Sequence, residues 1–125
     1  KHITLLVKRA PDLSEQELDD AVDAILTTHM DGIIVTNTTL ARDGLTSRHR
    51  DETGGLSGSP LRVRSGAVLA HLVKSVDGKI PIVSVGGIMN PEDAKKRQDL
   101  GATLIQVYTG LVYQGPGLVK KILVE

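Results

Sequence analysis

The sequence predicts an α/β fold in which four parallel strands alternate with helices, as in half of a (β/α)8 TIM barrel. Short aliphatic runs of strand length alternate four times with longer segments of helical period. The chain has no Trp, no Phe and only two Tyr, so its core must be aliphatic, which suits a parallel sheet covered by helices. Its 125 residues are about half of what a closed barrel needs. We therefore expect one domain over residues 1–125, completed by dimerisation or by a missing N-terminal half.

The first unit is expected to run from a strand over residues 3–8 into a helix. Ser14 and, three positions later, Glu17 have the spacing of a capping box. The apolar residues that follow at helical spacing are Leu18, Ala21, Val22, Ile25 and Leu26. This spacing predicts a helix with one buried face.

The second unit begins with a continuous aliphatic run over residues 32–36, as expected of a strand buried on both faces. A polar loop over about 40–59 follows, and so long a loop in a compact domain is usually functional or disordered. We expect a partly mobile lid. The helix predicted over 61–76 should bury Val68, Leu69, Leu72, Val73 and Val76.

The third and fourth units have clear boundary signals. A strand over 80–85 precedes Asn90-Pro91, a good N-cap followed by a good first helical residue. Gly101 should follow the end of that helix. A strand over 103–107 comes next, and 115–117 (Gly-Pro-Gly) opens a short terminal helix.

Composition excludes several function classes. Fifteen basic residues balance fifteen acidic ones, and no basic stripe interleaved with aromatics points to nucleic acid. The chain has no Cys, and its four histidines (His2, His29, His49 and His71) show no metal-ligand spacing. There is no apolar run of the ~18 residues that span a membrane and no signal-peptide pattern, so we expect a soluble, cytoplasmic chain.

Polar residues gather where each expected strand ends. Lys8 ends the first strand, residues 36–38 (Thr-Asn-Thr) the second, Gly86-Gly87 the third, and residues 108–110 (Tyr-Thr-Gly) the fourth. Ligands of such folds bind at this rim. The glycines and the Thr-Gly pair are typical of a phosphate cup, although Gly86-Gly87 could also serve only as a tight turn.

Two interpretations of Lys8 fit the sequence. Alternation puts it on the side of Leu6 and Thr4, where it would be a counter-charge or a Schiff-base amine inside the barrel. It could equally extend to solvent, and the neighbouring Arg9 leaves open which cation faces inward. Thr36, Asn37 and Thr38 could hydrogen-bond a planar polar ligand, or simply form a turn.

Five motifs resemble, in order and approximate spacing, those of the quinone-linked dihydroorotate dehydrogenases. The resemblance covers essentially the whole chain, and its most specific part is Glu-Thr-Gly-Gly-Leu-Ser-Gly. The motifs lie at residues 7–13 (VKRAPDL), 36–40 (TNTTL), 52–58 (ETGGLSG), 85–88 (VGGI) and 108–110 (YTG).

The resemblance implies the last four units of an FMN-binding barrel that oxidises dihydroorotate to orotate in pyrimidine synthesis and passes electrons to quinone. It places Lys8 beside the flavin, where it stabilises negative charge on the reduced ring. It also assigns FMN contacts to Thr36 and Gly58, and pyrimidine contacts to Asn37 and Thr38. The residues assigned to the ribityl phosphate are Gly87, Tyr108, Thr109 and Gly110.

Two departures from the family pattern matter. Arg9 stands where the family usually has an apolar residue. The family's general base is a serine of the N-terminal half, which is expected to be absent together with the membrane-associating helices. Ser57 and Ser59 belong to another motif, so we identify no catalytic residue and expect the chain alone to be inactive.

Two other functions remain open. Four strands leave two unpaired edges and an exposed inner face, so the chain could be a non-catalytic module that pairs into a barrel, for instance as a homodimer. Lys8 beside a phosphate cup would also suit an aldolase-like barrel that forms a Schiff base, which borohydride trapping would reveal.

Overall fold

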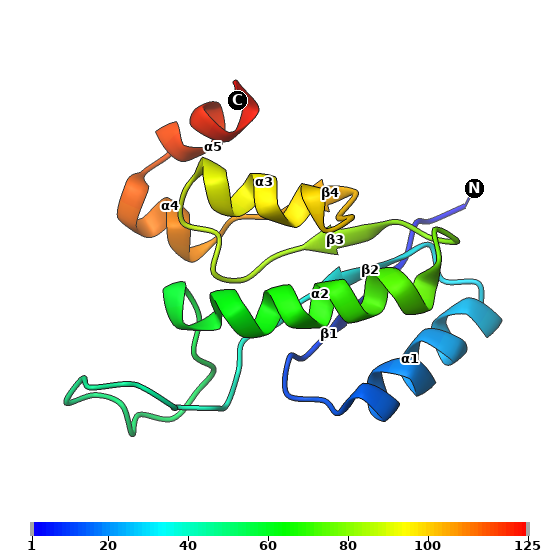
Figure 1. The fold of residues 1–125 in the computed structure, drawn as a ribbon, viewed down its shortest axis with the longest axis horizontal. Coiled ribbons are helices and arrows are strands. Elements are labelled where there is room, and N and C mark those ends of the chain that lie inside the picture. Colours follow the sequence, from blue (N-terminus) through cyan, green and yellow to red (C-terminus); the bar gives the residue numbers. More distant parts are fainter. Residues whose placement is uncertain (1, 125) are drawn as a thin grey trace.

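A computed structural model describes residues 2–124. Four parallel strands form one sheet in chain order: β1 (Leu6–Arg9), β2 (Gly32–Val35), β3 (Ile82–Ser84) and β4 (Leu104–Ile105). Helices alternate with these strands (Figure 1). The predicted fold class is confirmed, although each strand pairs over fewer residues than its aliphatic run.

The helices begin and end close to the predicted positions. They are α1 (Glu15–Thr27), α2 (Arg62–Val76), α3 (Pro91–Asp99), α4 (Thr109–Gln114) and α5 (Gly117–Leu123), with a 3-10 turn over Ser59–Leu61 before α2. Ser14 and Glu17 form the capping box, and the Asn90 side chain accepts a hydrogen bond from the Asp93 N–H at 2.8 Å. Gly101 follows α3 with φ +110°, as predicted for a residue just beyond a helix. The short α4 was not predicted.

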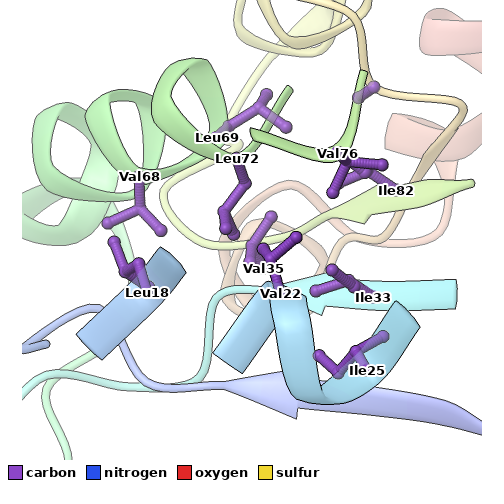
Figure 2. Packing of buried hydrophobic residues seen from close by; sticks show 11 residues of the cluster. Leu18, Val22, Ile25, Ile33, Val35, Val68, Leu69, Leu72, Val76 and Ile82 are labelled. Carbon is purple, nitrogen blue, oxygen red and sulfur yellow. The ribbon is translucent and has the colours of Figure 1, made fainter. Parts of the chain in front are cut away.

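The hydrophobic core lies between the sheet and the first two helices (Figure 2). The apolar face of α1 packs against α2, and both cover the side of β2 that carries Ile33 and Val35. Other buried members of this cluster are Leu18, Val22, Ile25, Val68, Leu69, Leu72, Val76 and Ile82. Removing this aliphatic surface from water is the main stabilising contribution.

Within residues 2–124 the opposite face of the sheet is less covered, mainly at its edge strands β1 and β4. The register aligns Lys8 with Ile34, Ile34 with Val83, and Val83 with Leu104, so these side chains share one face. Ile34 is only half-buried and Leu104 is 60% exposed. The expectation that β2 is buried on both faces therefore holds except at Ile34, which is partly exposed.

Arg9 lies on the helix-covered side of β1, and its Nε atom is buried without a hydrogen-bond partner. A buried donor left unpaired costs about 1–3 kcal/mol.

Replacing Arg9 with leucine should therefore raise the free energy of unfolding by about 1 kcal/mol, measured by urea denaturation. Lys74→Leu, a matched change on the exposed side of α2, should change it by less than about 0.5 kcal/mol. An unchanged or lower value for Arg9→Leu would contradict the prediction.

Candidate functional site

One cavity opens at the carboxyl ends of the four strands. Lys8 of β1 and the segments that follow β2, β3 and β4 form its wall, together with the end of the long loop before α2. Each site residue singled out from the sequence lines it: Lys8, Thr36, Asn37, Thr38, Gly58, Gly87, Tyr108, Thr109 and Gly110. Leu61, Met89 and Gln106 also line it, although sequence analysis did not assign them to the site.

Lys8 reaches this cavity and Arg9 does not, which answers the question of which cation faces inward. Lys8 lies at the end of β1 on the uncovered face, in register with Ile34. Arg9 points to the opposite side, because successive side chains of a strand alternate. The cavity therefore has one ammonium group in its wall.

The end of β2 supplies a buried hydroxyl and an exposed amide. Thr36 is 2% exposed, and its Oγ1 has no hydrogen-bond partner. Its backbone N–H donates to Val85 O at 2.8 Å, which fixes the residue beside the end of β3. Asn37 and Thr38 are exposed, and Asn37 Oδ1 accepts from the Thr38 N–H at 2.9 Å. A buried hydroxyl without a partner is costly, so a ligand group that bonded to Thr36 would be favoured.

Asp12 holds this strand end in place, a role that sequence analysis did not assign. Its carboxylate accepts hydrogen bonds from Thr39 Oγ1 and the Leu40 N–H, and it pairs with Arg64 of α2. Partial burial acts to raise the pKa of Asp12, but the bonds from Thr39, Leu40 and Arg64 outweigh it and hold the pKa below its ordinary value. Hydrogen bonds and an ion pair thus connect the segment that carries Asn37 and Thr38 to the loop after β1 and, through Asp12, to α2.

The Gly86-Gly87 turn lines the cavity at the end of β3. Gly87 has φ +74°, and a Cβ atom there would lie 2.3 Å from the Cα of Arg62. No L side chain fits such a position without moving the backbone. Among residues 2–124, the N–H groups of Gly86, Gly87 and Ile88 donate to no protein acceptor. These free donors suit a bound anion.

The segment after β4 lies directly against this turn. Gly110 is buried in the first turn of α4, and a Cβ atom there would lie 2.5 Å from the carbonyl oxygen of Ile88. First-turn N–H groups, here those of Thr109 and Gly110, have no acceptor within their own helix. The side chain of Tyr108 is 78% exposed, so it borders the cavity without being enclosed in it.

The loop over residues 40–58 is joined to the cavity at its end. Ser57 Oγ lies 2.9 Å from Thr109 Oγ1, and a Cβ atom at Gly58, which has φ +77°, would lie 3.0 Å from the Thr109 methyl group. Further out, the Arg42 guanidinium donates to backbone carbonyls of the same loop, including those of Arg50 at 3.1 Å and Glu52 at 3.2 Å. Figure 1 shows this loop extending away from the helices. Its mobility stays a prediction.

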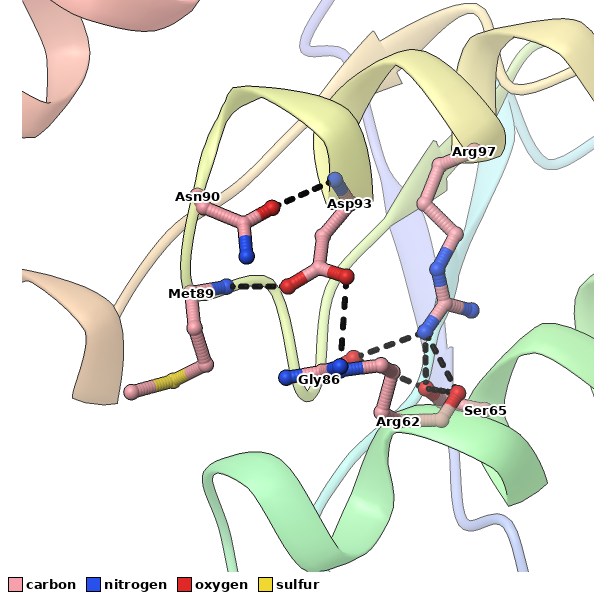
Figure 3. Close-up of polar contacts among 7 residues, drawn as sticks. All are labelled: Arg62, Ser65, Gly86, Met89, Asn90, Asp93 and Arg97. Atoms are coloured by element: carbon pink, nitrogen blue, oxygen red, sulfur yellow. Dashed lines mark hydrogen bonds and ion pairs between the residues drawn. The ribbon is translucent and has the colours of Figure 1, made fainter.

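A buried polar cluster supports the Gly86-Gly87 turn from behind (Figure 3). Arg97 is 3% exposed, and its Nη2 donates to Arg62 O at 2.7 Å, Ser65 Oγ at 2.7 Å and Gly86 O at 3.0 Å. Burial lowers the pKa of Arg97, and nearby Asp93 acts to raise it. Sequence analysis missed this cluster, because the Lys95-Lys96-Arg97 run suggests an exposed helix face.

The cavity can bind a ligand, but it has no evident base. The described residues that form its wall include no Asp, Glu or His. Their only serine is Ser57, whose hydroxyl is hydrogen-bonded to the Thr109 hydroxyl. Within residues 2–124, no group of three acidic or histidine side chains could hold a metal ion. No helix in the same range is long and apolar enough to cross a membrane.

The chain resembles known proteins over nearly its whole length. The family model described as dihydroorotate dehydrogenase matches residues 1–125. A quinone dihydroorotate dehydrogenase of Idiomarina loihiensis is 48% identical over 122 residues, covering 98% of this chain and 36% of that protein. One of Neisseria meningitidis is 48% identical over 124 residues, covering 98% of this chain and 37% of that protein.

A solved structure is also similar to this chain. The dihydroorotate dehydrogenase of Eimeria tenella, crystallised in complex with ferulenol, superposes with a TM-score of 0.92 at 42% identity, covering 98% of this chain and 32% of that one. The chain therefore spans about a third of the length of the relatives it matches, and the sheet is part of a barrel. On the family match and these relatives, this chain belongs to the dihydroorotate dehydrogenase family.

Proposed function

We propose that this chain is the FMN-binding C-terminal half-barrel of a quinone-linked dihydroorotate dehydrogenase, an enzyme that oxidises dihydroorotate to orotate. Family membership supports the activity of the complete protein. The observation that carries the cofactor assignment is the cavity itself, which combines free backbone donors at Gly86 to Ile88 with the unpaired buried hydroxyl of Thr36. The phosphate of FMN would accept hydrogen bonds from the backbone donors, and its polar ring would bond to the Thr36 hydroxyl.

The phosphate would be held between the Gly86-Gly87 turn and the start of α4. The N–H groups of Gly87, Thr109 and Gly110 come from two segments in contact, and the Thr109 hydroxyl lies beside them. Tyr108 would contribute through its backbone, since its ring is mostly exposed. Several N–H donors around one phosphate are a common mode of anion binding.

The flavin ring would lie towards β1 and β2, with Thr36 and Gly58 in contact with it. When bound, the ring supplies the hydride acceptor of the reaction. Lys8 would stabilise negative charge at that end of the cavity, because its ammonium group is the only one in the wall that the described residues form. Asn37 and Thr38 would hydrogen-bond the pyrimidine acid through an amide and a hydroxyl.

A titration with FMN tests the proposal. Flavin fluorescence and the visible spectrum are followed as the purified chain is added, with Lys8→Ala and Thr36→Val as site variants and Lys74→Ala as a matched surface control. We expect saturable binding by the native chain and the control, and weaker binding by both site variants. Absence of binding by the native chain, with normal circular dichroism, would contradict the proposed function.

We also propose that the chain associates through its uncovered sheet face. Leu6 and Leu104 on this face are 39% and 60% exposed, and β1 and β4 each leave one edge unpaired within the described sheet. Such surfaces favour association, either with a second copy or with the rest of a barrel. The chain alone should have a mass above that of a monomer in light scattering at micromolar concentration, and Leu104→Lys should lower it. A sharp monomer with cooperative unfolding would contradict this expectation.

A further inference from the structure

The peptide unit that joins Gly86 to Gly87 is held by two side chains on the side away from the cavity. Gly86 O accepts hydrogen bonds from Arg97 Nη2 at 3.0 Å and from Ser65 Oγ at 2.8 Å (Figure 3). In a planar trans peptide the C=O and N–H bonds point in opposite directions. Because the C=O of this unit points to Arg97, its N–H, which belongs to Gly87, points away from Arg97, and Gly87 itself lines the cavity.

The backbone alone does not determine this orientation. Both glycines have positive φ, +107° and +74°, and glycine adopts positive and negative φ about equally well. Within residues 2–124, neither Gly86 nor Gly87 donates a backbone hydrogen bond that would fix the turn. A flipped peptide would present a carbonyl oxygen to the cavity and repel an anion. The contacts from Arg97 and Ser65 select against that flip.

Arg97 is an unusual residue to bury for stability alone. It has no direct ion pair within the described chain, because the carboxylate of Asp93 pairs with Arg62 Nε, at 3.3 Å. Its Nη1 is buried without an acceptor, beside Gly66 of α2. A buried charge without a direct counter-ion is costly, and an apolar residue often packs such a place at least as stably. Its polar contacts instead go to Gly86 and to Arg62 and Ser65, which adjoin the same turn.

We propose that Arg97 is a positioning residue which, together with Ser65, fixes the Gly86–Gly87 peptide with its N–H towards the cavity, and that the preference of this site for a phosphorylated ligand depends on that orientation. The inference rests on the proposed FMN site and extends it to two side chains that do not touch the ligand. Arg97 also places a positive charge behind the phosphate position, which adds to the attraction.

The test compares FMN with riboflavin, which lacks the phosphate. Dissociation constants for both are measured by fluorescence for the full chain and for Arg97→Met, Arg97→Lys and Lys96→Met. Arg97→Met should weaken FMN binding about 10- to 100-fold, the range expected for losing a hydrogen bond to a charged group, and change riboflavin binding less than about 2-fold. Arg97→Lys should restore part of the loss. Lys96→Met, on the exposed side of α3, should behave as the native chain.

A second measurement is independent of flavin. NMR relaxation dispersion of the Gly87 and Ile88 amides should be flat in the native chain and in Lys96→Met, and should show exchange in Arg97→Met and in the milder Ser65→Ala. If the native chain binds neither flavin, the proposed function fails, and these amides alone decide the role of Arg97. Equal losses of FMN and riboflavin binding, or flat amide profiles in both variants, would overturn the inference.

Discussion

Replacing Gly87 with leucine should abolish FMN binding by this chain. A Cβ atom at this position would lie 2.3 Å from the Cα of Arg62 and 2.5 Å from its backbone nitrogen, so the turn would have to move away from α2. Neither contact is with a flexible side chain that could rotate away. The turn would then lose the alignment of its N–H groups, and each hydrogen bond to a charged group contributes about 1.5–3 kcal/mol. Losing two of them would weaken binding at least about 100-fold.

The control for this substitution is Gly78→Leu. Gly78 has nearly the same φ, +71° against +74°, but no atom lies within 4 Å of where its Cβ would be. It precedes β3, at the opposite end of the sheet from the cavity. Both variants should lose some stability from the left-handed backbone, while only Gly87→Leu should lose FMN. Equal FMN affinity in the two variants, both with native circular dichroism, would place the phosphate elsewhere.

Much of the fold was predictable because its signals are local. The four aliphatic runs, the Ser14–Glu17 capping box and the Asn90-Pro91 helix start act within a few residues, and the structure contains each of them. The α4 helix was not predictable. It has six residues, begins with Thr109-Gly110 and shows no apolar period, and its position leaves no room for a side chain at Gly110, where a Cβ atom would lie 2.5 Å from Ile88 O and 2.9 Å from Leu118 Cδ2.

That the candidate site residues would lie together was also predictable, because parallel strands bring their carboxyl ends together. Lys8, Thr36, Gly87 and Thr109 follow four different strands and line one cavity. The supporting residues were not predictable, since nothing local distinguishes a buried arginine from an exposed one. Arg97 is buried only because α2 and the Gly86 turn present their oxygens to it.

This chain with FMN bound should not oxidise dihydroorotate at an enzymatic rate. The reaction removes a hydride from one carbon and a proton from its neighbour. A positioned general base typically contributes ~10²–10⁴-fold to such a proton transfer. The cavity wall has no carboxylate and no imidazole, and the Ser57 hydroxyl is bonded to Thr109. In the proposed arrangement Lys8, the one lysine in this wall, stabilises negative charge on the ring and is not assigned the role of the base.

Anaerobic mixing tests this expectation. FMN-loaded chain is mixed with dihydroorotate, and the bleaching of the flavin absorbance is followed, with the full-length Idiomarina loihiensis relative as a positive control. We expect slow or no bleaching by the chain and rapid bleaching by the relative. Rapid bleaching by the chain alone that is lost in Lys8→Ala would contradict the prediction and show that a base exists among these residues.

Residual binding of dihydroorotate would not restore the rate. Asn37 and Thr38 can hold the pyrimidine acid, but contacts made equally in the ground state and the transition state do not accelerate chemistry. The relatives extend well beyond the matched segment, which is 36% of the Idiomarina loihiensis protein, and the remainder is where further ligands of the substrate would lie. Without them the substrate is poorly oriented, and orientation can contribute several kcal/mol. Substituting Asn37 with alanine should therefore weaken dihydroorotate binding while leaving the low rate of bleaching at saturating substrate nearly unchanged.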